Sequence, residues 1–158
     1  MTICRCSYNG GPYTHGDVNT PTTGEGYQLG MLRIRRDGFV SVEGGYVFNV
    51  PLSQMPQFIT VPLLPPSCST GTALALRMNF VSGVAGFVLV AVLDSAKDVA
   101  VRGYSLEEAD QSKGNFLDKV ATWRHGHWRL PATAGPLTLQ VALADASLFS
   151  LQLFCRHA

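Results

Sequence analysis

The sequence is poor in charged residues. Asp, Glu, Lys and Arg make up 15% of its 158 residues, against about 25% in an average globular domain. The net charge is +1 and the pI is near 7.7, so the chain lacks the charge imbalance typical of proteins that bind nucleic acid or anionic membranes. Two explanations for the low charge stay open. The surface is either rich in uncharged polar residues or covered by another domain or subunit.

The sequence also lacks long hydrophobic runs. The apolar stretch Ala85–Leu93 is much shorter than the ~20 residues that span a bilayer, and we expect it to be a buried strand. Residues Met1–Tyr8 do not contain the apolar core of a signal peptide. We therefore expect no membrane association and favour an intracellular location.

Cysteine is scarce. Cys4, Cys6, Cys68 and Cys155 are too few and too scattered to indicate a disulfide scaffold. Only one residue separates Cys4 from Cys6, whereas a zinc knuckle typically has two between its thiols. We expect reduced thiols, although their even number leaves disulfides open.

Motifs for catalysis are missing as well. There is no Gly-x-Ser-x-Gly nucleophile elbow and no Gly-rich loop that precedes a helix. Glu107, Glu108 and Asp110 lie in one short segment, whereas glycoside hydrolysis needs two carboxylates about 5 to 9.5 Å apart across the substrate. We predict no catalytic residue and no cofactor; a small hydrolase with an unrecognised site stays an alternative.

The pair His125 and His127 is the best candidate for metal binding. Two imidazoles two positions apart on a strand project to the same side and can bind a transition metal. No further His or Cys is nearby in sequence, and Trp123 and Trp128 flank the pair. A turn whose rings pack at one end of the domain is therefore favoured over a metal site.

Aromatic residues suggest a second kind of site. Tyr104, Trp123 and Trp128 could form a carbohydrate-binding platform, because aromatic rings cover the apolar faces of sugars. Packing in the core or at the end of a sheet is the competing explanation for each of them.

Alternating hydrophobic residues are the strongest positive signal. Leu137, Leu139, Val141 and Leu143 alternate with small or polar residues, and the pattern resumes at Phe149. The segment 72–81 alternates in the same way. A period of two predicts strands with one face on a core, so we predict an all-β domain.

Turn signals divide these strands. Residues 1–26 are rich in Gly, Thr, Pro and Asn and predict loops. Asp37-Gly38 lies between strand patterns at 27–35 and 39–43 and predicts a hairpin. Gly83–Gly86 predicts a turn between the strands 72–81 and 87–93.

Only one segment predicts a helix. Ser105 and Glu108 have the spacing of a capping box, but the residues that follow limit it to a turn or two. The expected fold is thus a two-sheet antiparallel β-sandwich, jelly-roll-like, with one short helical turn.

Several segments follow one another in an order found in a known family. They are Leu32–Val42, Val90–Asp94, Gly103–Glu108, Val120–Trp123, Leu137–Leu143 and Ala144–Gln152. Together they resemble the C-terminal β-sandwich module of glycoside hydrolase family 32-like proteins. Residues 1–31 look like the end of a last propeller strand, and residues 32–158 correspond to the sandwich.

The resemblance implies a role without catalysis. In that family a five-bladed propeller carries the catalytic carboxylates, and this chain contains no such propeller, so no catalytic residue is carried over. The resemblance implies an accessory or interaction module whose partner is a propeller domain or a second copy of the chain. A carbohydrate-binding module is the alternative.

Overall fold

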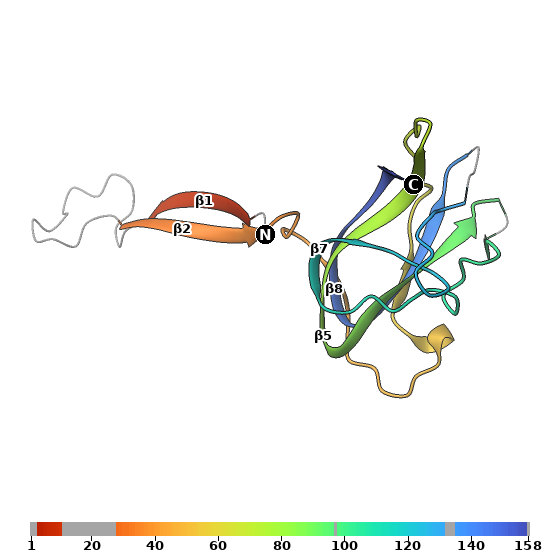
Figure 1. The fold of residues 1–158 in the computed structure, drawn as a ribbon. Coiled ribbons are helices and arrows are strands. Elements are labelled where there is room, and N and C mark those ends of the chain that lie inside the picture. The colour runs from red at the N-terminus through yellow and green to blue at the C-terminus, as the bar shows by residue number, and fades with distance from the viewer. Residues whose placement is uncertain (1–2, 11–27, 97, 132–134, 158) are drawn as a thin grey trace, which may run out of the picture. The chain divides into compact units, whose positions relative to one another are not determined.

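A computed structural model describes residues 3–10, 28–96, 98–131 and 135–157. The chain forms two compact units, Met1–Phe39 and Val40–Ala158 (Figure 1). In the first unit, strand β1 (Ile3–Gly10) pairs antiparallel with β2 (Gln28–Arg35) over eight residues each. The loop expected across residues 1–26 therefore contains a strand, and its part from residue 11 onwards lies outside the described residues.

The predicted hairpin at Asp37-Gly38 is wrong. The turn itself forms, because the Gly38 N–H donates to the Arg35 carbonyl at 2.9 Å and Asp37 adopts a φ of 56°. However, β2 pairs with β1, and the chain after the turn pairs with a strand near the C-terminus. A turn signal specifies a local reversal, whereas the choice of partner depends on which strand edge the rest of the fold offers.

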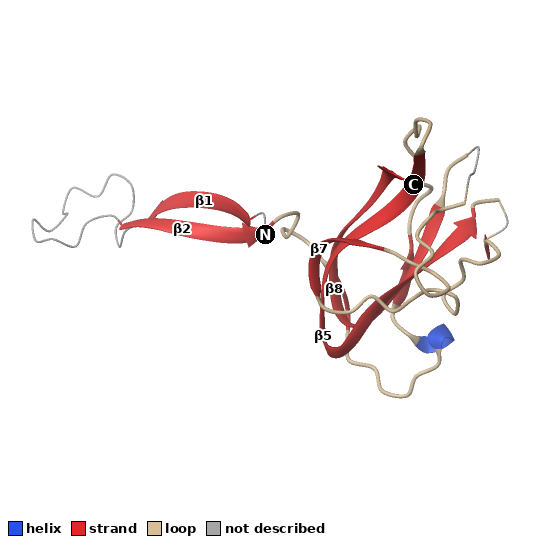
Figure 2. Cartoon of the chain, viewed as in Figure 1, coloured by secondary structure: helices blue, strands red, loops and turns tan. Residues whose placement is uncertain are grey.

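The second unit is one six-stranded sheet built on two long strands. β5 (Thr72–Asp94) and β8 (Thr138–His157) run antiparallel along nearly their whole length. Shorter strands extend this ribbon on both sides: β3 (Val42–Gly44) and β4 (Gln57–Ile59) pair with β8, and β6 (Val99–Ala100) and β7 (Asn115–Val120) pair with β5. Strands dominate the unit in Figure 2.

The ribbon bends in its middle. Ser82 lies opposite Ala146 and Phe87 opposite Ala144, so the four residues Gly83–Gly86 face the single residue Asp145. A side chain on Gly86 would overlap the carbonyl oxygen of Asp145. Extra residues on one strand of a pair bend it, and glycine here allows the two backbones to approach closely. The turn expected at Gly83–Gly86 is thus a bend within one continuous strand.

The bend brings both halves of the ribbon into one core. The main buried cluster takes alternate residues from each half of β5, exemplified by Leu76 and Val90, together with Val141 of β8. A second cluster covers the opposite face of the later half of β5, where Leu89 packs with Met55. The segment 87–93 is therefore buried on both faces. The alternations around Leu76 and Leu139 predict the core-facing residues correctly, but at the register shift beside Phe149 the core residue is Leu148.

The all-β class is confirmed. The finer prediction of two stacked sheets in a jelly roll stays a prediction. The strand pairing places all six strands of the second unit in one hydrogen-bonded sheet. The helical turn expected at Ser105–Glu108 is a plain turn, and the helical element of the described residues is a 3₁₀ turn, η1, at Leu52–Gln54. Within the described ranges, no helix has the length and apolarity needed to cross a membrane.

A disulfide joins Cys68 to Cys155 across 87 positions of sequence. The expectation of reduced thiols is wrong for this pair. Cys155 lies opposite Leu74 near the start of β5, and Cys68 precedes the turn that leads into that strand, so the fold brings together two thiols that the sequence keeps far apart. Disulfides persist in oxidising compartments, so this pair gives no support to an intracellular location.

Replacing Gly86 with alanine tests the bend. We expect Gly86→Ala to lower the free energy of unfolding by about 2 to 3 kcal/mol, because the added methyl group overlaps backbone atoms of β8 that cannot turn aside. Urea unfolding measures the loss. Gly45→Ala is the control, since a methyl group there meets no atom within 4 Å; equal losses in both variants would contradict the role of Gly86.

Removing the disulfide tests its contribution. The double substitution Cys68→Ser and Cys155→Ser should lower the free energy of unfolding by about 3 to 4 kcal/mol, because the crosslink closes a long loop in the unfolded chain. A reducing agent should destabilise the wild type to the level of the variant and leave the variant unchanged. A wild type that is insensitive to reduction would refute the prediction.

Candidate functional site

The turn Trp123–His127 is the centre of the residues singled out by the sequence. Trp123 and His127 exchange two backbone hydrogen bonds of 2.7 Å. Arg124, His125 and Gly126 between them have φ values of 47°, 63° and 105°. Left-handed conformations are uncommon for residues other than glycine, so this turn depends on support from its surroundings.

Two acidic residues supply that support. The Asp110 carboxylate accepts hydrogen bonds from the backbone N–H groups of His125 at 2.9 Å and Gly126 at 2.8 Å. The Arg124 guanidinium forms an ion pair with Glu108, and its Nε lies 3.0 Å from Oε1. Two of the three candidate acids therefore hold the turn, while Glu107 is exposed.

These contacts also set the pKa of each carboxyl group. A hydrogen bond from Arg124 is the main reason why the pKa of Glu108 is lowered. Partial burial acts to raise the pKa of Asp110, but hydrogen bonds from Thr122, His125 and Gly126 outweigh it, and the pKa falls below its ordinary value of 3.8. Both carboxyls are thus held ionised, whereas a general acid needs a raised pKa.

Tyr104 and Trp123 are packed together. Trp123 is fully buried, and its indole N–H donates to the Val90 carbonyl at 2.8 Å. The Tyr104 ring meets the indole edge-on at 5.2 Å, and its hydroxyl donates to the Arg129 carbonyl at 2.8 Å. Burial is the main reason why the pKa of Tyr104 is raised. The Trp123 side chain belongs to the core and has no surface to offer a sugar.

Trp128 is half-buried and lies next to two arginines. The guanidinium carbons of Arg129 and Arg156 are 5.6 and 4.8 Å from the centre of its ring. The three aromatic residues proposed for carbohydrate binding, Tyr104, Trp123 and Trp128, therefore do not form an open platform in this structure.

The structure brings the two candidate metal ligands, His125 and His127, to one turn. The His127 Nε2 lies 3.2 Å from the Tyr104 hydroxyl, and both histidines are exposed. Within the part of the chain that the structure describes, no group of three or more His, Cys, Asp or Glu side chains is placed to hold a metal ion. The pair therefore gains no third ligand there.

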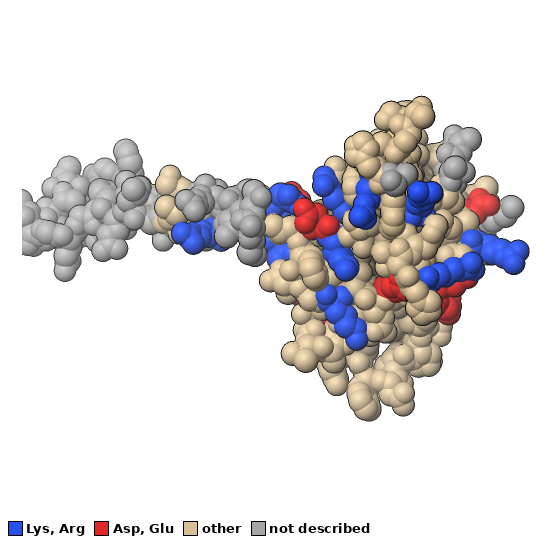
Figure 3. All heavy atoms as spheres, in the orientation of Figure 1, with Lys and Arg blue, Asp and Glu red and all other residues tan. Residues whose placement is uncertain are grey.

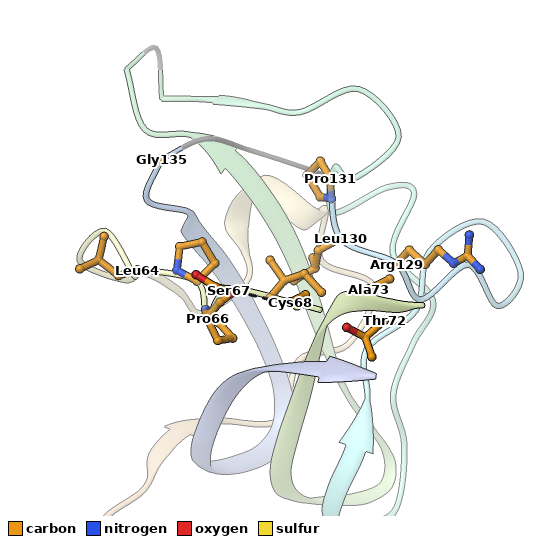
Figure 4. Close-up of a pocket in the computed structure, with 12 residues that line it drawn as sticks. Leu64, Pro66, Ser67, Cys68, Thr72, Ala73, Arg129, Leu130, Pro131 and Gly135 are labelled. Atoms are coloured by element: carbon orange, nitrogen blue, oxygen red, sulfur yellow. Dashed lines mark hydrogen bonds between the residues drawn. The ribbon is translucent and has the colours of Figure 1, made fainter. Parts of the chain in front are cut away.

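A cavity of about 580 Å³ opens beside the disulfide (Figure 4). Its walls are mainly apolar, and its lining includes Leu64, Pro66, Leu130 and Pro131. Arg129 is the one charged residue of that lining and lies on the side opposite Leu64. The volume suits a small ligand, but the described lining offers no acid or base for catalysis.

Comparisons with models of known families, with curated proteins and with solved structures give no match for this chain. The resemblance to the C-terminal module of glycoside hydrolase family 32-like proteins thus stays a prediction.

Sequence reasoning missed one feature that is readable without a structure. The 33 residues from Gly44 to Leu76 contain no Asp, Glu, Lys or Arg. We call residues 44–76 the uncharged segment. It leaves five large hydrophobic side chains exposed: Tyr46, Phe48, Ile59, Val61 and Leu64. The signal is present in the sequence. It was missed because a charge fraction averaged over the whole chain hides how the charges are distributed.

Replacing Asp110 tests its role in the turn. At neutral pH we expect Asp110→Asn to lower the free energy of unfolding by about 1 kcal/mol, a modest value because solvent screens the partly exposed carboxylate. The lowered pKa means that the carboxylate stabilises the fold above pH 3.8, and that this stabilisation is lost as the pH falls through the folded-state pKa.

Unfolding curves at neutral and acid pH measure this effect. Wild type and Asp110→Asn should converge in acid. Glu107→Gln removes the same charge three residues earlier and should leave stability unchanged at both pH values. A difference between wild type and Asp110→Asn that is independent of pH would show that the carboxylate charge does not matter.

Proposed function

We propose that this protein is a non-catalytic interaction module whose uncharged segment packs against a protein partner. The observation that carries the proposal is the exposure of large apolar side chains there, with Phe48 79% and Leu64 81% exposed. Apolar patches rimmed by polar residues are typical of interaction surfaces.

The local packing supports this view. Val47 and Val50 turn inward and pack with Phe87 and Met55 over the outer face of the bent ribbon. Tyr46 and Phe48, which flank Val47 in sequence, stay exposed. The loop that carries them runs at the lower end of the unit in Figure 1, and Figure 3 shows no Lys, Arg, Asp or Glu side chain at that end. A partner can therefore contact the Tyr46 and Phe48 rings, which the packing of Val47 and Val50 holds in place. It does so without removing water from charged groups.

The position of the candidate acids supports a role without catalysis. Glu108 and Asp110 are engaged in holding the Trp123–His127 turn, and the low pKa of each suits that task. The resemblance to an accessory sandwich agrees with such a role, with a propeller domain or a second copy of the chain as the partner.

Self-association provides a direct test. We expect sedimentation equilibrium of the wild type to give a mass that rises above 17.0 kDa with concentration, and Tyr46→Ser with Phe48→Ser to restore the monomer. Val99→Ser is the control, because Val99 is an exposed apolar residue of β6, outside the uncharged segment. A strictly monomeric wild type that binds no hydrophobic dye would overturn the proposal.

A further inference from the structure

Three arginines lie on or beside the outer face of the sheet. Arg77 of β5 is directly opposite Gln152 of β8, and Ala73 is directly opposite Arg156. Opposed residues of an antiparallel pair share a face, and the intervening residues, such as Leu76, point into the core. Arg129 joins them because it shares the Trp128 ring with Arg156. We call Arg77, Arg129 and Arg156 the arginine face.

Aromatic rings hold these arginines in place. The Arg77 guanidinium carbon lies 5.1 Å from the centre of the Phe154 ring, and its Nε and Nη2 both donate to Oε1 of Gln152, at 2.9 and 2.6 Å. Arg156 and Arg129 lie over Trp128 at 4.8 and 5.6 Å. A guanidinium over a ring is attracted to its π face and can keep N–H groups free for a ligand.

The arginine face takes no part in the ion pairs of the described residues. Their ion pairs join Arg36 to Asp37 and Arg124 to Glu108, and no described carboxylate pairs with an arginine of the face. Three cations thus gather in a protein whose net charge is +1. Such a cluster attracts anions, and a guanidinium binds carboxylate or sulfate groups through two parallel hydrogen bonds.

The disulfide further fixes the geometry. Cys155 lies between Phe154 and Arg156, and its bond to Cys68 anchors this end of β8. A site fixed before binding loses less entropy when a ligand arrives. The bond also indicates an oxidising compartment, such as the cell exterior, where acidic polysaccharides occur.

We propose that the arginine face binds an acidic polysaccharide, through its sulfate or carboxylate groups. Proteins that bind single-stranded nucleic acid stack bases on open aromatic rings, whereas guanidinium groups already lie over Trp128 and Phe154. The ligand is therefore recognised by the N–H edges of the arginines. None of the three arginines belongs to the uncharged segment, although Ala73 of that segment lies opposite Arg156. Heparin binding is therefore measured separately from self-association.

Calorimetric titration with heparin, a sulfated polysaccharide, tests the proposal. We expect Arg129→Gln and Arg156→Gln each to weaken heparin binding about tenfold, as for the loss of a charge-assisted hydrogen bond. Arg102→Gln is the matched control: Arg102 is exposed and lies outside the face, so the same loss of charge should change affinity less than twofold. Arg156→Lys keeps the charge and should recover part of the binding.

Further ligands separate the alternatives. Alginate, which carries carboxylates, should also bind in low salt, whereas neutral dextran should not. Equal weakening by Arg102→Gln and Arg156→Gln would overturn the proposal, and so would binding of oligothymidylate that is tighter than that of heparin and depends on the same arginines. If a Gln variant fails to fold, the wild type still decides, because desulfated heparin must bind more weakly than heparin.

Discussion

The pairing of β5 with β8 is the constraint on which the rest of the C-terminal unit depends. The two strands hydrogen-bond along nearly their whole length, and the bend opposite Asp145 turns their inner faces into one core. Each shorter strand adds to an edge of this ribbon. Were the ribbon straight, Leu76 and Val90 would lie on a long open face, and their burial, the main stabilising contribution, would be lost.

Much of this architecture could be predicted from the sequence. The alternations around Leu76 and Leu139 identify the strands and the residues that face the core, because a period of two is set by local backbone geometry. Partner choice could not be predicted. Asp37-Gly38 forms its turn but joins no hairpin, and Gly83–Gly86 bends one strand where a break between two was expected. Both outcomes depend on β8, which is distant in sequence. Its edge pairs with β3, which follows the Asp37-Gly38 turn, and its backbone lies against Gly86 at the bend.

The candidate site was predictable to a similar degree. The spacing of Trp123 and Trp128 around two histidines favours a turn, and the structure places one there. The part played by Asp110 could not be predicted, because its contacts to His125 and Gly126 arise from tertiary packing. The arginine face could not be predicted from the sequence either. Arg77, Arg129 and Arg156 are spread over 80 positions. The register of β5 and β8 brings Arg77 and Arg156 to one face, and the Trp128 ring joins Arg129 to Arg156.

The crosslink between Cys68 and Cys155 changes what a protease can do to this protein. It encloses β5, β6, β7 and most of β8, together with every loop between them. A single cut in any of those loops leaves both fragments covalently attached, and the long strands still hold each other in register. The molecule can therefore be nicked between β5 and β8 without falling apart.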